Sequence, residues 1–293
     1  MKKRVYLVPC AVALLTLGMA IFYICQAFFA KQLLPFVGYG GVFNKTTNGI
    51  LWIPHYWFML SIGAIIACLL AFWRRQLYEL NVWQTIAVMI FLPLEAVVGS
   101  KLLFALENGF IFSGMSLFGG VFMTVATVPI LAKVLKKPMA RMYDFIAPMG
   151  MTLIAFVRMG CFMDGCCGAA PKYVGDKYFV LPIQLFEVVL DLGVLAVLLY
   201  LEQNKLSFGE KAKKINFYNG TLALVILTSY GAYRFILEFW RNTPKVHLGM
   251  SIGQIYALII LAFGASLLYY RKYVCDEAIA KQKRKEQRRH KTK

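Results

Sequence analysis

Residues 217–241 read FYNGTLALVILTSYGAYRFILEFWR, an apolar run that ends in charged residues. The run is long enough to span a bilayer, which needs a helix of about 20 apolar residues. On a helix, four polar side chains near its end share one face: Tyr230, Arg234, Glu238 and Arg241. Charges at membrane depth are costly and usually face a protein interior or a cavity, so the stripe predicts a functional site. Paired arginines suit a phosphate, which points to a lipid or nucleotide headgroup.

The whole chain has the composition of an integral membrane protein. Of its 293 residues 60% are apolar and 16% are charged, whereas soluble domains carry about 25% charged residues. The net charge of +18 could indicate nucleic acid, but the basic residues gather in short blocks between apolar runs and in the tail 281–293. That distribution is typical of basic cytoplasmic loops. We therefore expect the lipid bilayer, and no nucleic acid, as a partner.

The apolar runs predict an all-α fold, a polytopic membrane helix bundle of about eight transmembrane helices. The candidate spans are 5–30, 51–73, 82–106, 115–135, 142–163, 183–201, 217–239 and 250–270. The fifth span is unusual because it contains Asp144, Pro148 and Arg158.

Most of the 32 Lys and Arg residues fall on one side of this topology when the N-terminus is cytoplasmic. Both termini are then cytoplasmic, and the polar clusters lie toward the outer side. The first span could be a cleaved signal peptide, but its length of about 26 residues and the lack of a small-x-small site favour a retained helix. We predict an extra helix and outer loop over 1–50, one membrane domain over 51–270 and a basic cytoplasmic tail over 271–293.

A second polar cluster, residues 158–168 with the sequence RMGCFMDGCCG, lies at the outer end of the fifth span. Its three glycines allow the chain to leave helical geometry, which at membrane depth requires burial or a cavity. We expect Arg158 to sit where the helix breaks. Non-helical amides together with an arginine would form an anion cradle.

Two further polar segments open predicted spans. In PIQLFE, residues 182–187, Gln184 and Glu187 share a helix face with Asp191. Glu187 could act on a substrate or could simply pair with an arginine or cap backbone amides, and both readings stay open. The aromatics of PHYW, residues 54–57, are of a type that usually forms an interfacial belt.

The chain has seven cysteines, of which three form a C-x4-C-C pattern at the outer side: Cys161, Cys166 and Cys167. The others lie in apolar spans or the tail: Cys10, Cys25, Cys68 and Cys275. A catalytic thiol, a disulfide and plain packing all stay open for the triplet, with a structural role favoured. A zinc site would want a fourth ligand and a more usual spacing, so no metal is expected, although His55 and His247 also occupy outer positions.

From about Tyr56 to Tyr270, the ordered motifs resemble the prolipoprotein diacylglyceryl transferases. These motifs are GMSLFGG at 114–120, DFIAP at 144–148, RMGCFMDG at 158–165, PIQLFE at 182–187, YGAYRFILEFWR at 230–241 and SIGQ at 251–254. The resemblance implies a multi-pass protein of the bacterial plasma membrane. Such an enzyme moves diacylglyceryl from phosphatidylglycerol to the lipobox cysteine thiol of a prolipoprotein signal peptide and releases glycerol phosphate. No cofactor is implied.

The resemblance also implies roles for individual residues. The catalytic residues would be Arg234, Tyr230, Glu238 and Tyr56. The substrate-binding residues would be Arg158, Arg241, Gln184, Glu187, Asp164 and Gly160.

Several positions depart from the family pattern. Phe118 stands where the family places a histidine that is thought to act as base on the incoming thiol. Cys161 and Cys166 replace an asparagine and a glutamate, Asp164 replaces a second asparagine, and Lys101 replaces an arginine. The base would then be Tyr230, Asp164, Glu238 or a cysteine thiolate. The alternatives are a lipid transferase with a different acceptor and a non-catalytic phospholipid-binding protein.

Overall fold

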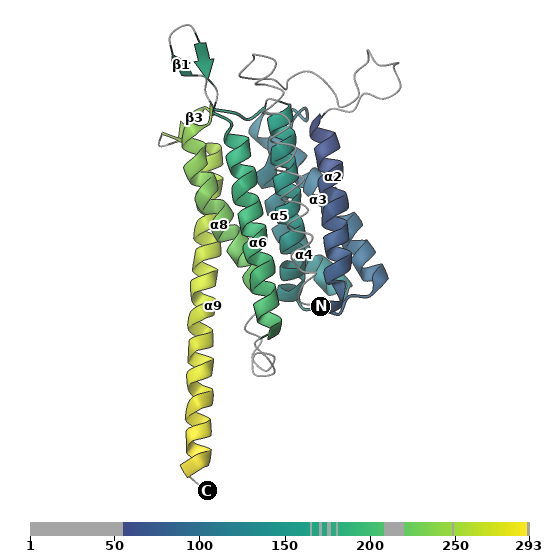
Figure 1. Ribbon diagram of the computed structural model, residues 1–293, viewed down its shortest axis with the longest axis vertical. Helices are drawn as coiled ribbons and strands as arrows, with labels where there is room; N and C mark the ends of the chain where they lie inside the picture. The colour runs from purple at the N-terminus through teal and green to yellow at the C-terminus, as the bar shows by residue number, and fades with distance from the viewer. Residues whose placement is uncertain are drawn as a thin grey trace.

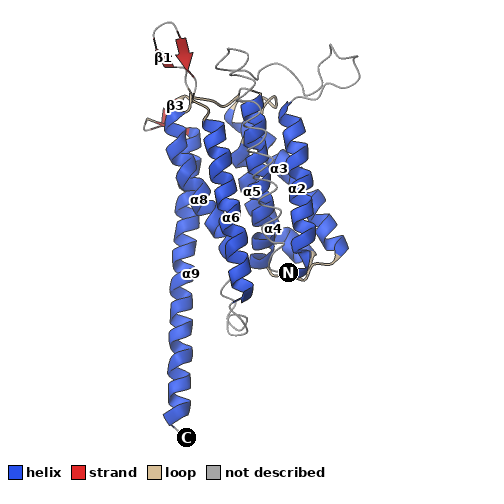
Figure 2. Ribbon diagram, in the orientation of Figure 1, coloured by secondary structure: helices blue, strands red, loops and turns tan. Residues whose placement is uncertain are grey.

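A computed structural model describes residues 55–164, 166–169, 172–174, 177–179, 181–207, 220–247 and 249–291. Within these residues the fold is a bundle of long helices with two small hairpins at one end (Figures 1 and 2). The long helices are α2 (His55–Arg74), α3 (Val82–Glu107), α4 (Leu117–Val134), α5 (Met139–Met163), α6 (Ile183–Ser207), α8 (Thr221–Leu237) and α9 (Ile252–Lys291). The 3-10 turns η2 (Arg75–Tyr78) and η4 (Glu238–Trp240) extend α2 and α8.

The described residues contain seven helices long and apolar enough to cross a membrane, in agreement with the last seven predicted spans. A polytopic membrane helix bundle is thereby confirmed. The predicted span 5–30 lies outside the described residues, so the total of eight, the sides of the termini and the division at residues 50 and 270 stay predictions.

The hairpins mark one end of the bundle, called here the hairpin end. Strand β1 (Lys172–Val174) pairs antiparallel with β2 (Lys177–Phe179), with Tyr173 opposite Tyr178. Strand β3 (Lys245–His247) pairs antiparallel with the two-residue β4 (Met250–Ser251). Helix α9 runs far beyond the bundle at the opposite end (Figure 1).

Helix α5 is the centre of the bundle, because 89% of its apolar window is buried against 22–44% for the other spans. This position explains why the fifth span tolerates polar residues. The carboxylate of Asp144 accepts backbone hydrogen bonds from Gly220 at 2.6 Å and Leu222 at 2.8 Å. It thus caps the start of α8, whose first amides lack helical partners.

Close helix contacts depend on glycines. A Cβ built on Gly160 of α5 would lie 3.0 Å from the Cα of Tyr56 in α2, and one on Gly119 of α4 would lie 2.2 Å from the carbonyl oxygen of Gly99 in α3. Small residues let helix backbones approach in membranes, where packing replaces the hydrophobic effect as the driving force.

The bundle also has a buried ion pair at the end away from the hairpins. Arg74 is fully buried and donates to Glu202 at 2.5 Å and to the carbonyl oxygen of Phe145 at 2.8 Å. Tyr78 donates to the same carboxylate of Glu202. These bonds hold α2, α5 and α6 together.

Candidate functional site

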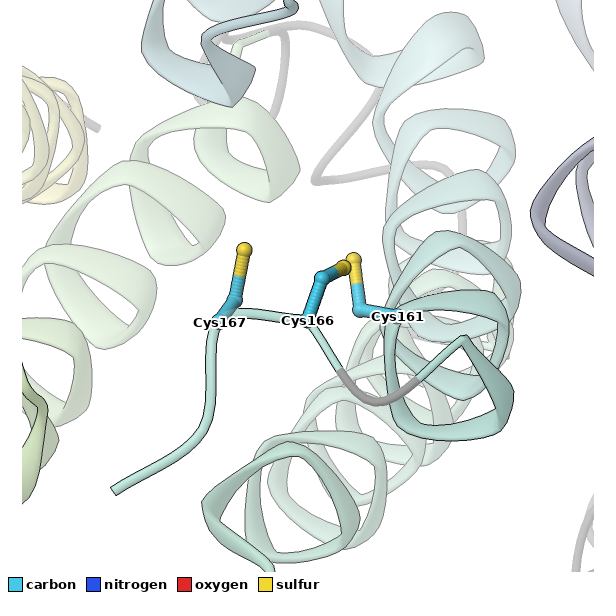
Figure 3. A group of neighbouring side chains, drawn as sticks. All are labelled: Cys161, Cys166 and Cys167. Atoms are coloured by element: carbon cyan, nitrogen blue, oxygen red, sulfur yellow. The ribbon is translucent and has the colours of Figure 1, made fainter. Parts of the chain in front are cut away.

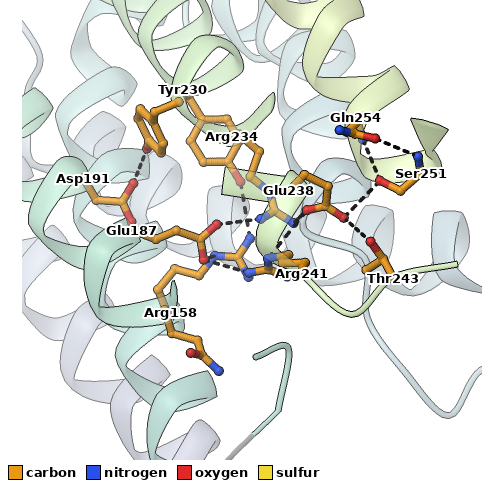
Figure 4. Close-up of polar contacts among 12 residues, drawn as sticks. Arg158, Glu187, Asp191, Tyr230, Arg234, Glu238, Arg241, Thr243, Ser251 and Gln254 are labelled. Atoms are coloured by element: carbon orange, nitrogen blue, oxygen red, sulfur yellow. Dashed lines mark hydrogen bonds and ion pairs between the residues drawn. The ribbon is translucent and has the colours of Figure 1, made fainter. Parts of the chain in front are cut away.

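Three arginines and two glutamates meet in the hairpin-end half of the bundle (Figure 4). We call them the arginine centre: Arg158, Glu187, Arg234, Glu238 and Arg241. They come from α5, α6, α8, η4 and the residue after η4. The site therefore forms only when these separate segments pack together. Their side chains are almost entirely buried, each at most 6% exposed.

Glu187 is the common partner of all three arginines. One of its oxygens lies 2.6 Å from Nη1 of Arg234. The other lies 3.1 Å from Nε of Arg158 and 2.8 Å from Nη2 of Arg241. The structural role left open for Glu187 is therefore present: it pairs with arginines. Buried charges need such pairing, and the pairing also fixes the directions of the three guanidinium groups.

Glu238 forms the second junction. Its Oε2 lies 2.9 Å from Nη2 of Arg234 and 3.6 Å from Nε of Arg241. Its Oε1 accepts hydrogen bonds from Thr243 at 3.0 Å and Ser251 at 3.1 Å. Glu238 thus links the arginine centre to the segment that opens α9.

The expected stripe on one continuous helix is wrong in its geometry. Helix α8 ends at Leu237, η4 follows, and Arg241 has extended backbone with φ −76° and ψ 150°. Arg241 nevertheless returns to the same site, because it pairs with Ala169 in an isolated antiparallel bridge.

Arg158 was expected at a helix break, and this too is wrong. Helix α5 continues to Met163, so Arg158 points from regular helix into the bundle. Its Nη2 lies 3.5 Å from the hydroxyl of Tyr230. The chain leaves helical geometry only after Asp164, beyond the arginine.

The remaining predicted site residues position the loop after α5. The Asp164 carboxylate accepts from the backbone N–H of Tyr56 at 3.2 Å, and Gln184 donates to the carbonyl oxygen of Cys166 at 2.6 Å. Gly160 allows α2 to approach α5 at Tyr56. These four residues lie at the hairpin end, beside the arginine centre rather than within it.

Two contributors were missed by the sequence reasoning. The hydroxyl of Tyr233 donates to the buried carboxylate of Asp191, one turn along α6 from Glu187. Thr243 bonds Glu238. The i, i+3 spacing of Tyr230 and Tyr233 could have indicated that Tyr233 faces the site. Thr243 lies after the helix, where no sequence pattern indicates its position.

Phe118 lies directly against the arginine centre. The guanidinium of Arg234 is 5.9 Å from the centroid of its ring, within range of a cation–π contact. The ring also packs on Tyr230 and Tyr256 at centroid distances of 6.2 and 5.4 Å. The side chain of Phe118 therefore faces the site but cannot take up a proton.

The three cysteines at the end of α5 and in the segment after it are close together (Figure 3). The Sγ atoms of Cys161, Cys166 and Cys167 all lie within 4.8 Å of one another, and all three are free thiols. Hydrogen bonds from the other two thiols, and then the charges of Arg158 and Arg241, lower the pKa of Cys167. The cysteine group and the arginine centre are thus electrostatic neighbours.

Fold and site together define a membrane helix bundle with a buried cluster of three arginines and two glutamates in its hairpin-end half. The sequence profile of the family "Prolipoprotein diacylglyceryl transferase" matches residues 46–270, and the chain belongs to this family. Membership and the seven spans make it a multi-pass protein of the bacterial plasma membrane.

Curated relatives can be aligned with this chain over most of their length. The chain is 25% identical over 248 residues to the phosphatidylglycerol–prolipoprotein diacylglyceryl transferase of Dehalococcoides mccartyi, covering 76% of this chain and 91% of the relative. It is 26% identical over 248 residues to the protein of Clostridium perfringens designated transferase 2, covering 74% and 90%. With the Idiomarina loihiensis transferase it shares 31% identity over 173 residues, covering 54% and 60%.

Proposed function

We propose that the chain transfers the diacylglyceryl group of phosphatidylglycerol to the cysteine thiol of a prolipoprotein lipobox and releases glycerol phosphate. The observation that carries the proposal is the convergence of three guanidinium groups on Glu187 at 2.6 to 3.1 Å. A buried, preorganised group of arginines matches the phosphate of an anionic lipid. The activity after which the family and its relatives are named supports the same substrate.

The arginines would act on the leaving group. In the reaction the thiolate sulfur attacks the glyceryl CH₂, the C–O bond to phosphate breaks, and its electron pair moves onto the phosphate oxygen. Fixed donors aimed at that developing charge lower the barrier, and they act more strongly away from water. Among the described residues, Nε of the buried Arg234 has no hydrogen-bond acceptor, and a phosphate oxygen would supply one.

We assign Arg234 and Glu238 to charge stabilisation, with Arg158 and Arg241 holding the phosphate. Tyr230 orients Arg158 through the 3.5 Å contact of its hydroxyl. Glu187 would hold the three guanidinium groups in position. The residues that would keep the loop after α5 in place for the signal peptide are Tyr56, Gly160, Asp164 and Gln184.

A second candidate is transfer to a different acceptor, because the side chain beside Arg234 is Phe118, which cannot act as a base on a thiol. Comparing peptide thiols with small thiols, amines and alcohols as acceptors separates the two candidates.

The test uses the full chain in proteoliposomes, with phosphatidylglycerol labelled in its headgroup and a synthetic lipobox peptide. We expect release of labelled glycerol phosphate, and a fall of about 100-fold or more for Arg158→Gln. The matched control is Arg141→Gln, since Arg141 forms a half-exposed pair with Glu79 at 3.2 Å. Unchanged release by Arg158→Gln would contradict the assignment. Lipid binding without release to any acceptor would favour a non-catalytic lipid-binding protein.

A further inference from the structure

The three thiols of Cys161, Cys166 and Cys167 are close enough together to reach one metal ion. Their Sγ atoms lie within 4.8 Å of one another, and a tetrahedral zinc ion with Zn–S bonds of about 2.3 Å holds its sulfurs about 3.8 Å apart. Each distance between two Sγ atoms therefore exceeds the spacing around a zinc ion by about 1 Å at most, a difference that small side-chain rotations can close.

The backbone is arranged so that two consecutive cysteines serve the same cluster. The N–H of Cys166 donates to the carbonyl oxygen of Cys161 at 3.0 Å, which folds the chain back over the end of α5. Cys167 then has a left-handed backbone with φ 61°, a conformation uncommon for residues other than glycine. Gln184 fixes the turn through its 2.6 Å bond to the carbonyl oxygen of Cys166.

The cysteine segment is tied to the arginine centre through the backbone. Ala169, two residues after Cys167, pairs with Arg241 in an isolated antiparallel bridge. Asn242 also donates to the carbonyl oxygen of Gly168 at 3.4 Å, beside the bridge between Ala169 and Arg241. These contacts fix the position of the segment after Cys167 relative to Arg241.

The cluster also has an accessible side. Cys161 is buried, whereas Cys166 and Cys167 are exposed. In the part of the chain that the structure describes, the group of metal-binding side chains consists of these three thiols. Structural zinc sites are closed by four protein ligands, whereas catalytic sites use three and keep one exchangeable position. Three ligands, which argued against a structural site, fit a catalytic one.

We propose that Cys161, Cys166 and Cys167 bind a zinc ion whose fourth position takes the incoming thiol. The second half of this proposal rests on the proposed transferase function. A thiol bound to zinc loses its proton, which passes to water, and becomes a nucleophile at neutral pH. Its sulfur attacks the glyceryl CH₂, and the electron pair of the broken C–O bond leaves on the phosphate oxygen. The resulting thioether is uncharged and leaves the ion.

This arrangement supplies what Phe118 cannot. The ring of Phe118, which lies beside the guanidinium of Arg234, has no atom that accepts a proton. The zinc site would thus activate the thiol, while the neighbouring arginine centre binds the phosphate.

The first experiment measures metal content without any reaction. The full chain is purified in detergent, loaded with Zn²⁺ or Co²⁺, and compared with Cys161→Ser, Cys166→Ser and Cys167→Ser. Cys68→Ser is the matched control, because Cys68 is a free thiol within α2. We expect one zinc per chain and a thiolate-to-cobalt absorption band in the wild type and the control, and loss of both in the cluster variants. A chain that takes up neither ion, or that carries a disulfide within the cluster when freshly prepared, would overturn the site.

The second experiment tests contact with the acceptor. Adding a lipobox peptide to the cobalt protein should change the cobalt spectrum, and a peptide with serine in place of the lipobox cysteine should not. An identical spectrum with both peptides overturns thiol coordination.

Transfer by zinc-free and zinc-loaded protein separates the two proposals. Transfer that requires zinc supports both. Transfer that survives zinc removal overturns thiol activation and leaves the transferase function standing. A zinc-bound protein that releases glycerol phosphate to no acceptor overturns the transferase function and leaves the metal site standing.

Discussion

Arg234 and Glu187 face each other between α8 and α6, with Nη1 of the arginine 2.6 Å from Oε1 of the glutamate. Glu187 is the junction through which the guanidinium groups of three separate segments are held together. Its substitution should therefore affect stability as well as activity.

Glu187→Gln should lower the free energy of unfolding by about 3 kcal/mol, because removing one partner of a buried ion pair leaves uncompensated charge. Thermal unfolding in detergent measures the change. In Glu79→Gln, the matched control at the exposed pair with Arg141, the loss should stay below about 1 kcal/mol. Equal melting temperatures for the two variants would contradict a central role for Glu187.

Arg234→Lys should retain the fold and lose about 100-fold or more in transfer rate. A lysine ammonium is a single point charge, whereas Arg234 bridges Glu187 and Glu238 through different nitrogens. Initial rates of glycerol phosphate release measure the effect, with Arg141→Lys as control. A lysine variant as fast as wild type would show that bridging the two carboxylates is unimportant for transfer.

Gly119→Ala should destabilise the bundle, because its Cβ would lie 2.2 Å from the carbonyl oxygen of Gly99 and push α3 from α4. Gly150→Ala, with open space around the new Cβ, should instead be neutral or stabilising by about 0.5–1 kcal/mol. Thermal melting of the two variants decides the matter, and the reverse order would show that the α3–α4 contact is not as close as described.

Phe118→His should introduce a proton acceptor beside Arg234, whose guanidinium faces this ring at 5.9 Å. We expect transfer by the double variant Phe118→His/Cys167→Ser to exceed that of Cys167→Ser alone. The control is the double variant Phe122→His/Cys167→Ser, since Phe122 belongs to the same cluster of rings through its contact with Tyr256. Equal rescue by both histidines, or by neither, would separate Phe118 from the thiol chemistry.

The sequence predicts the membrane bundle because apolar runs of bilayer length have few other structures available to them. It also indicates the charged residues of the site, since a charge at such depth needs a partner. What it cannot predict is which partner. The pairing of Arg74 with Glu202 and the meeting of all three arginines at Glu187 depend on helix packing between distant segments.

The sequence also did not predict the local backbone geometry at two places in the site. The helix pattern alone placed Arg241 on α8, although the chain changes to a 3-10 turn after Leu237. Likewise, the spacing of the cysteines gave no sign that a backbone bond between Cys166 and Cys161 and a left-handed Cys167 would gather three sulfurs.

The arginine centre contains three guanidinium groups and two carboxylates, so one positive charge remains uncompensated. A phosphodiester lipid carries one negative charge and would bring the site to neutrality. The phosphate monoester left after transfer carries about −1.5 to −2 at neutral pH, which would give the buried site a negative excess. Such an excess is costly where water is scarce. The same charges that attract the lipid would therefore favour release of the product. Product release would not need a separate conformational change to drive it.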